Sequence, residues 1–260
     1  MRLPGLRVLK PAAATLLAVA LGLAPLAAAA ASPFADWAAV VVSGDFHSSH
    51  TNNPTETFDN ARRDVAAELI KKGFSPDNVL QFSVRPDRYP DVHPGMADPE
   101  PIYEGLKGLA QRATGGCLVY FTSHGAPQGV VVDGQFLPPR VMDEMVTDAC
   151  GDRPIVVIVS ACFSGVFVPV LAGPNRMILT AARPDRSSFG CSESDKYPYF
   201  DACVLQALPG AHDFVALGPK VQACVARRET ETGMSPPSEP QMFVGPQLRF
   251  TLPLMAFAPG

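Results

Sequence analysis

The sequence predicts an α/β sandwich built on a mostly parallel sheet, and two features predict it. Apolar, β-rich runs alternate along the chain with segments of helical periodicity, and two of these runs, residues 117–122 and 154–161, are almost continuously apolar. Continuous apolar runs are typical of parallel strands that helices cover on both faces. Because repeated strand–helix units connect such strands by right-handed crossovers, we expect a helical layer on each face of the sheet.

The amino-terminal part of this domain contains two strand–helix units. Residues 38–44 are a short β-rich run, and residues 58–73 follow with apolar side chains at helical spacing and a glycine at the end. Residues 78–84 predict a second strand. After a proline-rich loop at residues 85–101, residues 102–113 predict a second helix.

The carboxyl-terminal part supplies the remaining strands. The two almost continuous apolar runs, residues 117–122 and 154–161, are joined by residues 141–150, which suit a crossover helix. Residues 175–183 predict another strand of the same type. After a turn-rich connector, residues 242–250 predict a last segment that pairs at an edge of the sheet.

Composition places the chain among ordinary globular proteins. It has 260 residues, of which 47% are hydrophobic and 18% are charged, and its formal net charge is −4. A slightly acidic chain without a basic patch lacks the usual footprint of nucleic-acid binding. We therefore expect a single folded domain and no nucleic-acid partner.

The first 31 residues have the pattern of a signal peptide. Arg2, Arg7 and Lys10 precede an alanine- and leucine-rich stretch that ends in small residues. A membrane anchor is the alternative, but a glycine and a proline interrupt the stretch, and its end suits cleavage. We expect a signal peptide at residues 1–31, a mature domain at residues 32–260, a periplasmic or secreted protein, and no membrane association after cleavage.

Six cysteines follow the expected cleavage site, and export allows disulfides among them. They are Cys117, Cys150, Cys162, Cys191, Cys203 and Cys224. If one thiol stays free for catalysis, the remaining five cannot all pair within the chain. We expect at least one more buried free thiol, and Cys117 is the candidate because it lies in a strand-like run.

Metal ligands are sparse in this sequence. No two cysteines have CxxC spacing, and His47 and His50 have no cysteine or acidic partner at a spacing that suits zinc. We therefore interpret the segment around these two histidines as a solvated loop, and we expect neither a metal nor a cofactor.

A histidine and a cysteine stand at the ends of two predicted strands. His124 follows the strand at residues 117–122, and Cys162 follows the next one. Since the carboxyl ends of parallel neighbours lie at one edge of a sheet, the imidazole and the thiol should meet there. A thiol beside an imidazole is the arrangement of nucleophilic cysteine catalysis. The backbone N–H groups of Gly125 and Cys162 are then candidates to bind a developing oxyanion.

These strand ends also match a known family. YFTSHG at residues 120–125 and IVSACFSG at residues 158–165 resemble the caspase/legumain clan of cysteine peptidases, in which an apolar strand ends in His-Gly and a later one in Ala-Cys. The closer resemblance is to legumain-like peptidases of family C13, in a bacterial form, and it covers nearly the whole mature chain. It implies a caspase-like three-layer αβα sandwich and a catalytic pair of Cys162 and His124.

The resemblance further implies a substrate pocket. In legumains the segment after the next strand lines the pocket for the side chain before the scissile bond, and its counterpart here contains Ser187 and Ser188. Asp201 would form a further polar wall, and Arg62 or Arg63 would take the place of the pocket arginine. Hydroxyls with one carboxylate suit an amide side chain, so we expect cleavage after Asn first and after Asp at acidic pH.

Three positions depart from the legumain pattern. Ser123 and Ser160 stand where legumains carry acidic residues ahead of the catalytic pair, and Phe163 stands where an acid follows the nucleophile. These departures bear on which side chain is preferred before the cut and leave the reaction type unchanged.

The expected function is an exported cysteine endopeptidase that acts on peptide or protein substrates through a thioester acyl-enzyme. Two alternatives stay open, a transpeptidase on the same catalytic pair and a catalytically silent peptide-binding module. The residue that orients His124 is also open, with Asn52, Asn53 and Asn60 as candidates.

Overall fold

A seven-stranded sheet forms the centre of the molecule. The computed structural model describes residues 31–259 together with Met1 and Gly5, so the predicted signal peptide at residues 1–31 lies almost entirely outside the described residues. The strand order is β10 (Gln241–Val244), β9 (Arg176–Thr180), β8 (Ile155–Ser160), β4 (Gly116–Thr122), β1 (Trp37–Ser43), β2 (Val79–Ser83) and β3 (Gly95–Met96). Every neighbouring pair is parallel except β9 and β10.

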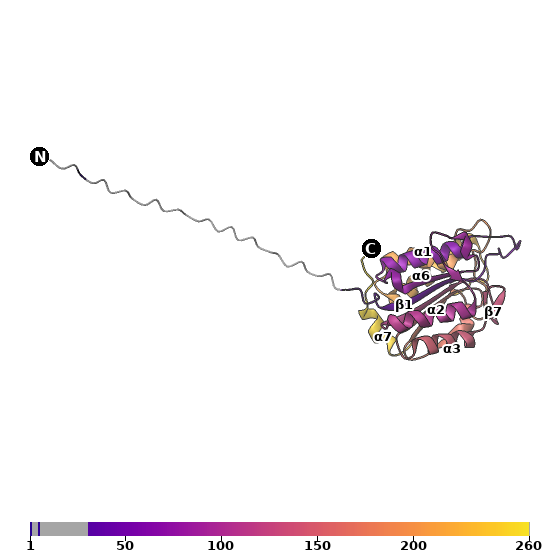
Figure 1. The fold of residues 1–260 in the computed structure, drawn as a ribbon. Helices are drawn as coiled ribbons and strands as arrows, with labels where there is room; N and C mark the ends of the chain where they lie inside the picture. Colours follow the sequence, from indigo (N-terminus) through magenta and orange to yellow (C-terminus); the bar gives the residue numbers. More distant parts are fainter. Residues whose placement is uncertain (2–4, 6–30, 260) are drawn as a thin grey trace. The chain divides into compact units, whose positions relative to one another are not determined.

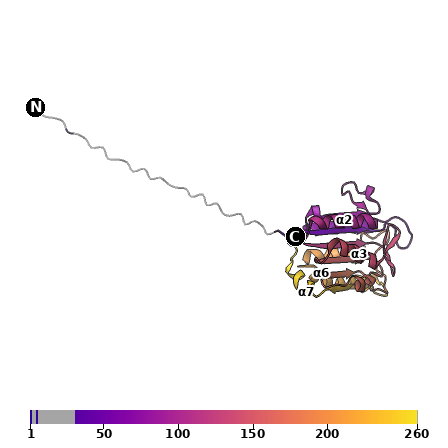
Figure 2. The same ribbon diagram turned by 60° about the horizontal axis from the view of Figure 1, so that its bottom comes forward.

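Helices cover both faces of this sheet (Figure 1). One face carries α1 (Thr57–Lys71), α5 (Tyr199–Ala207) and α6 (Phe214–Thr232), and the other carries α2 (Pro99–Arg112), α3 (Pro139–Cys150) and α4 (Phe167–Leu171). On the second face, α2 and α3 lie side by side (Figure 2). The predicted three-layer αβα sandwich is confirmed.

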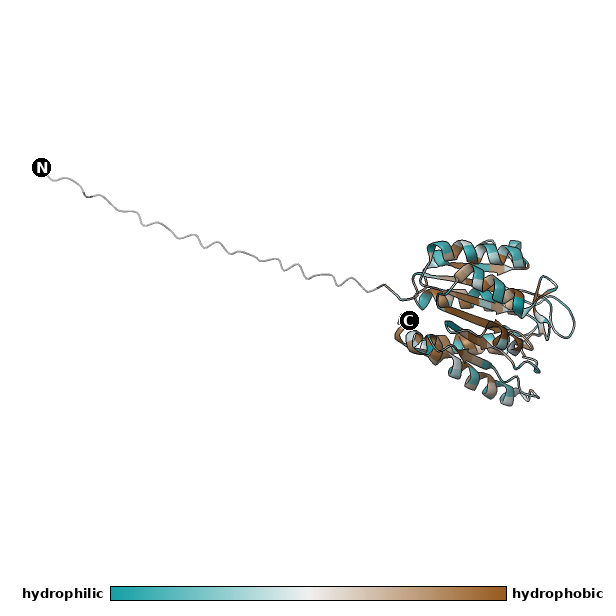
Figure 3. Cartoon of the chain, turned by 90° about the horizontal axis from the view of Figure 1, so that it is seen from below, coloured by the Kyte–Doolittle hydropathy of each residue, from teal (hydrophilic) through white to brown (hydrophobic). Residues whose placement is uncertain are grey.

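Strand β1 shows how the sequence produces two cores. Ala39 and Val41 pack toward α1, α5 and α6, whereas Ala38, Val40 and Val42 pack toward α2 and α3. Side chains alternate between the faces of a strand, so a strand that is covered on both faces must be apolar at every position. Figure 3 shows the result, since the hydrophobic strands lie between helices whose outer faces are hydrophilic.

A small antiparallel sheet lies, along the sequence, between the two strands that carry the predicted catalytic pair. It consists of β5 (Gly125–Ala126), β6 (Gly129–Val132) and β7 (Gln135–Leu137), and α3 then leads back to β8. At the other edge of the main sheet, the predicted last segment begins as β10, which pairs antiparallel with β9. It then turns into the short helix α7 (Leu248–Thr251) instead of continuing as a strand. Five short 3₁₀ turns lie at residues 76–78, 86–88, 164–166, 208–210 and 252–254.

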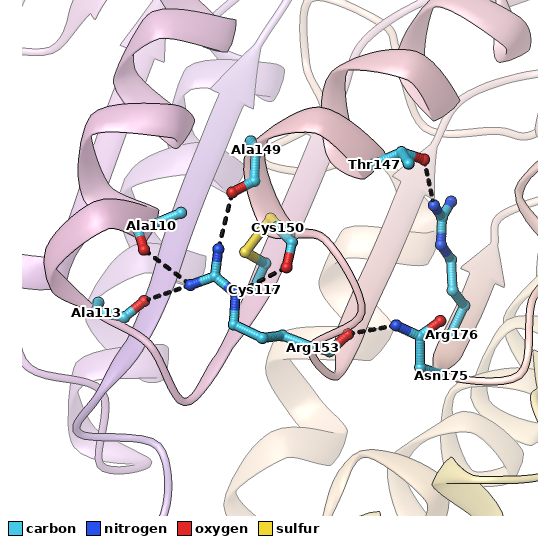
Figure 4. The surroundings of a disulfide bond; sticks show 9 residues. All are labelled: Ala110, Ala113, Cys117, Thr147, Ala149, Cys150, Arg153, Asn175 and Arg176. Carbon is cyan, nitrogen blue, oxygen red and sulfur yellow. Dashed lines mark hydrogen bonds between the residues drawn. A yellow bond between two sulfur atoms is a disulfide. The ribbon is translucent and has the colours of Figure 1, made fainter.

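Two disulfides correct the prediction for the cysteines. Cys117 is bonded to Cys150, which links β4 to α3, and Cys203 is bonded to Cys224, which links α5 to α6. Figure 4 shows the first of these beside the ends of α2 and α3. The expectation of a free Cys117 is therefore wrong, because the end of α3 crosses the start of β4 and brings a second thiol to it. The free cysteines are Cys162 and Cys191.

None of the helices described at residues 31–259 is both long and apolar enough to cross a membrane.

Candidate active site

The two strands that carry the predicted catalytic pair are neighbours in the sheet. Thr122 of β4 is in register with Ser160 of β8, and the last backbone bond between them runs from the Ser123 N–H to the Ser160 carbonyl, at 3.0 Å. His124 and Cys162 each follow two residues after this registered pair. The parallel register therefore delivers both side chains to the same edge of the sheet, as the sequence predicts.

Glycine at position 125 lets the two strand ends approach closely. A Cβ built on Gly125 would lie 2.3 Å from the carbonyl oxygen of Cys162 and 3.3 Å from its nitrogen. Real Cβ atoms do not come so close to a backbone oxygen, so a side chain here would force the two segments apart. The segment that follows His124 thus lies directly against the backbone of Cys162.

The chain turns sharply after Cys162. Phe163 has a φ of 57°, in the left-handed region that non-glycine residues rarely occupy, and a 3₁₀ turn begins directly after it. The Phe163 N–H donates to the carbonyl of Arg186 at 2.8 Å, which holds the loop after β9 against this turn. Backbone strain of this kind persists where the surrounding structure fixes it, and it clusters at active sites.

The same loop places Ser188 against the thiol. The Ser188 N–H donates to Cys162 Sγ at 3.2 Å, and the Sγ to Ser188 carbonyl distance is 3.5 Å. An N–H that points at sulfur suits a thiolate, because a hydrogen bond to the charged form stabilises it. Within the described residues, Ser188 is the hydrogen-bond partner of Cys162, and Sγ makes no hydrogen bond to His124.

A backbone carbonyl orients the imidazole of His124. Nε2 of His124 lies 2.9 Å from the carbonyl oxygen of His47, and the ring packs edge-on against Phe58 with 5.0 Å between the ring centroids. Since a carbonyl only accepts, Nε2 carries the proton and Nδ1 of the neutral ring is left as the base.

None of the three candidate asparagines has this role. Asn53 binds Glu193, the side chain of Asn60 donates to the carbonyl of Lys196, and Asn52 is exposed. The sequence carries no signal for the true partner, because every residue type supplies the same main-chain carbonyl as His47 does.

A pocket of about 460 Å³ opens over His124 and Cys162. Its lining includes His124, Cys162, Ser187 and Ser188, so these four predicted site residues are brought together. The volume lies in the range of small-ligand and side-chain pockets.

The carboxylate that lines this pocket is one the sequence analysis missed. Asp195 is half-buried in the lining, and its Oδ2 accepts the N–H of Ser192 at 2.9 Å. Ser188 of the segment before it contacts the thiol, and Asp195 lines the same pocket seven residues later. Only the folded loop reveals that position.

Asp201 lies beneath the pocket, which corrects the prediction that it forms a pocket wall. It is fully buried and absent from the lining, and its carboxylate accepts hydrogen bonds from the hydroxyls of Tyr120, Thr122 and Ser160. Burial raises the pKa of Asp201 to about 6, although these three hydroxyls lower it in part. Asp201 faces the sheet because it lies on the inner side of α5.

Arg62 is likewise not brought to the pocket. Its side chain is fully buried in α1, where Nε binds Asp59 at 3.0 Å and Nη1 binds Gln81 at 2.6 Å. Its neighbour Arg63 is exposed and pairs with Asp64. On the same helix, Phe58 contacts His124, so the side chain that α1 presents to the catalytic pair is apolar.

The second free cysteine lines the same pocket as the first. Cys191 is buried, and burial raises its pKa well above the usual range, with the neighbouring Cys162 as a smaller cause. A thiol that resists ionisation is a poor nucleophile. Of the two free cysteines, Cys162 is therefore the one placed for chemistry.

The chain is similar to known proteins in sequence and in fold. A model of the Peptidase C13 family matches residues 34–213. No curated protein sequence matches the chain significantly.

Among solved structures, caspase-1 from Spodoptera frugiperda is similar with a TM-score of 0.58 and 15% identity, covering 82% of this chain and 88% of its own. A structure described as pro-sf-caspase-1 is similar with a TM-score of 0.56 and 14% identity, covering 80% of this chain and 90% of its own. At these identities, the similarity establishes the fold alone.

Proposed function

The chain belongs to the Peptidase C13 family of cysteine peptidases, and from that premise we propose that it is an endopeptidase whose nucleophile is Cys162 and whose base is His124. One observation carries the proposal. The thiol and the imidazole end neighbouring parallel strands and line one pocket, while the described remainder of the chain offers one other free thiol, Cys191, which burial keeps protonated.

The reaction follows from the orientation of the imidazole. Nε2–H of His124 donates to the His47 carbonyl, so Nδ1 is free to take the thiol proton. The sulfur then attacks the carbon of the peptide carbonyl. The oxygen that becomes negative faces the backbone N–H groups of Gly125 and Cys162. The imidazolium then gives its proton to the leaving amine, which departs and leaves a thioester on Cys162.

Water completes the cycle. His124 takes a proton from water at Nδ1, the hydroxide attacks the thioester carbonyl, and the acid product leaves as the proton returns to the sulfur. Substrate fits between the Cys162 thiol and the His124 imidazole, which make no direct hydrogen bond to each other. Contacts between catalytic groups are often long when no substrate is bound.

We further propose that cleavage follows Asn. Oδ1 of Asp195 has no hydrogen-bond donor among the described residues, so it can accept an amide N–H from the substrate, while the hydroxyls of Ser187 and Ser188 can donate to the amide oxygen. An ionised Asp side chain would be repelled by Asp195. We therefore expect cleavage after Asp only at acidic pH, where the carboxyl of the substrate side chain is protonated.

The catalytic proposal is tested by covalent labelling. A peptidyl electrophile with Asn at its end should add one label to the wild-type protein, as measured by intact mass, and none to Cys162→Ala. The variants Cys162→Ala and His124→Ala should each lose about 10³-fold or more in turnover while remaining folded. Cys191→Ala is the matched control, since it removes the other free thiol and should still be labelled. Labelling that persists in Cys162→Ala would disprove the assignment.

The pocket proposal is tested by a substrate library. Asp195→Asn should raise cleavage after Asp relative to cleavage after Asn at neutral pH, whereas Asp201→Asn should leave this ratio unchanged because Asp201 does not line the pocket. A dominant preference for Leu or Phe before the cut would contradict the pocket assignment and leave the catalytic pair in place.

We also propose that the protein is exported. The pattern of its first 31 residues supports export, and so do the disulfides Cys117–Cys150 and Cys203–Cys224, since such bonds persist in oxidising compartments.

A further inference from the structure

A buried carboxylate connects the two strands that end in the catalytic pair. Oδ2 of Asp201 accepts the Thr122 hydroxyl of β4 at 2.9 Å and the Ser160 hydroxyl of β8 at 2.6 Å. Both hydroxyls therefore converge on a single oxygen atom. Thr122 lies two residues before His124, and Ser160 lies two residues before Cys162.

The second carboxylate oxygen has a different kind of partner. Oδ1 accepts the phenol of Tyr120, which lies on β4 like Thr122. This bond is a second link between Asp201 and β4, two residues farther from the strand end than the Thr122 link. Asp201 thus binds β4 at two positions and β8 at one, and only the Thr122 and Ser160 hydroxyls come from the registered pair at the strand ends, a difference that can be tested.

The backbone ladder stops short of the catalytic residues. Its last bond between these strands runs from Ser123 to Ser160, so His124 and Cys162 lie beyond it. The hydroxyl bridge acts at the point where the ladder ends. It is anchored from a third element, since Asp201 belongs to α5 and Cys203 on the same helix is fixed to α6 by a disulfide.

The position of this carboxylate needs an explanation, because a fully buried charge is unfavourable. Asp201 does not line the pocket, so it cannot touch substrate, and the described residues around it supply hydroxyls with no cation bound to it. Three apolar residues in place of the hydroxyls and a small apolar residue on α5 would fill the same space without this cost.

We propose that Asp201 is a positioning residue that sets the separation of Cys162 and His124 by holding Thr122 and Ser160 on one carboxylate oxygen. The inference rests on the proposed function, since it assigns a role relative to that catalytic pair. Misplacement of a reacting group by about 1 Å can cost about 100-fold in rate. Loss of the bridge should therefore lower kcat and leave KM almost unchanged, because the pocket lining is intact.

The experiment separates the bridge from simple packing by paired variants. Thr122→Val keeps the shape of the side chain but loses the hydroxyl, and Thr122→Ser keeps the hydroxyl. We expect kcat to fall about 10- to 100-fold in Thr122→Val and in Ser160→Ala, and to return to within about threefold of wild type in Thr122→Ser. The double variant Thr122→Val/Ser160→Ala should be little worse than Ser160→Ala alone, since Ser160 is the contact that links the carboxylate to β8 among the described residues.

Tyr120→Phe is the control for structure alone. It removes a hydrogen bond from the same carboxylate but leaves Thr122 and Ser160 at the strand ends both bound to Oδ2, so it should lower the melting temperature and change kcat by less than about threefold. Thermal unfolding measured for each variant shows whether it is folded, and the kinetics are compared among folded variants only.

Two results would overturn the inference. One is a wild-type kcat in folded Thr122→Val or in folded Ser160→Ala, and the other is a loss in Tyr120→Phe as large as theirs. If neither bridge variant folds, Thr122→Ser with a kcat lowered about tenfold or more would also contradict it. Failure of the proposed function would look different, because the wild-type protein itself would then show neither labelling of Cys162 nor turnover. In that case the inference would be wrong as well.

Discussion

At the scale of single residues, the site depends on close approaches between backbone segments that lie far apart in the sequence. Gly125 touches the backbone of Cys162, Phe163 accepts a left-handed conformation in the turn that follows, and the carbonyl of His47 holds the imidazole. Main-chain atoms take part in all three. They determine where the thiol and the imidazole stand, and a small displacement at any of them changes the catalytic geometry.

Gly125→Ala should disable the site through this close approach. The new Cβ would lie 2.3 Å from the Cys162 carbonyl oxygen, so the two strand ends must separate. We expect turnover to fall about 100-fold and the free energy of unfolding to fall by about 1 to 3 kcal/mol.

Gly108→Ala in α2 provides the matched control for that substitution. No atom lies within 4 Å of a Cβ built there, and alanine favours a helix. Turnover should stay at the wild-type value and the free energy of unfolding should rise by up to about 1 kcal/mol. Equal turnover in the two variants would show that the approach at Gly125 is unimportant.

Asp201 should make the stability of the fold depend on pH in an unusual direction. Burial raises the pKa of its carboxyl to about 6, above the ordinary 3.8, so the folded state retains a proton that the unfolded state releases between these values. The contribution of this group to stability is therefore complete below about pH 4 and falls as pH rises to about 6, by on the order of 3 kcal/mol.

Urea titrations at a series of pH values would measure this effect as the difference between wild type and Asp201→Asn. Taking the difference cancels the contributions of carboxyls with the opposite trend, such as Glu56 and Asp64. Burial raises the pKa of each of these two groups, but hydrogen bonds and nearby arginines lower it by more. A difference that stays constant from pH 4 to pH 6 would contradict the prediction.

At the scale of secondary-structure elements, the end of the sheet opposite His124 and Cys162 is held by one arginine and one disulfide. Arg153 donates to four carbonyls at or near the ends of α2 and α3, those of Ala110, Ala113, Ala149 and Cys150 (Figure 4). Carbonyls at a helix end have no partner in the helix, and the partial negative charge there favours a cation. The Cys117–Cys150 disulfide lies at the same place and fixes α3 to the start of β4.

Removal of this disulfide should cost stability without changing catalysis. The bond spans 33 residues, for which loop-closure entropy predicts about 3 to 4 kcal/mol. The double variant Cys117→Ala/Cys150→Ala should lose that amount in urea unfolding, while kcat of the folded protein stays the same because the bond lies at the start of β4 and the catalytic residue at its end. Cys191→Ala, which removes a thiol but no cross-link, is the control. A loss of turnover equal to that of the bridge variants would contradict the separation of the two ends.

At the scale of the whole molecule, the sheet divides the fold into two cores and presents its reactive groups at one edge. Continuous burial of β1, β4 and β8 leaves few places for polar side chains, and those near the active site occur at the strand ends. The disulfides link β4 to α3 on one face and α5 to α6 on the other, so each helical layer has one cross-link.

The proposed export can be tested through the two disulfides. When the chain is produced with its first 31 residues, we expect a protein that begins at Ser32, lies outside the cytoplasm, and carries both disulfides, as intact mass and peptide mapping without reductant would measure. A chain that starts at Ser32 and lacks the leader should remain in the cytoplasm with these four cysteines largely reduced. Retention of the full-length chain in the cytoplasm would contradict the proposal.

Sequence patterns alone predicted most of the layered architecture and the placement of His124 and Cys162 at one edge of the sheet. Both depend on local signals, namely apolar runs that must be buried on two faces and reactive residues directly after them. The helices α5 and α6 were not predicted. Gly218 and Pro219 interrupt the pattern of α6 near its start, and α6 forms because its apolar side chains pack on the sheet.

The tertiary structure decided the partners. Which cysteine pairs with Cys117, which carboxylate lines the pocket and which group orients His124 all depend on segments that lie far apart in the sequence. Asp201 shows the physical reason. The sequence around an acidic residue near a predicted pocket does not reveal whether its side chain faces substrate or the core. Its direction was set when α5 packed on the sheet and turned the carboxylate toward three hydroxyls, and Asp195 was left to line the pocket.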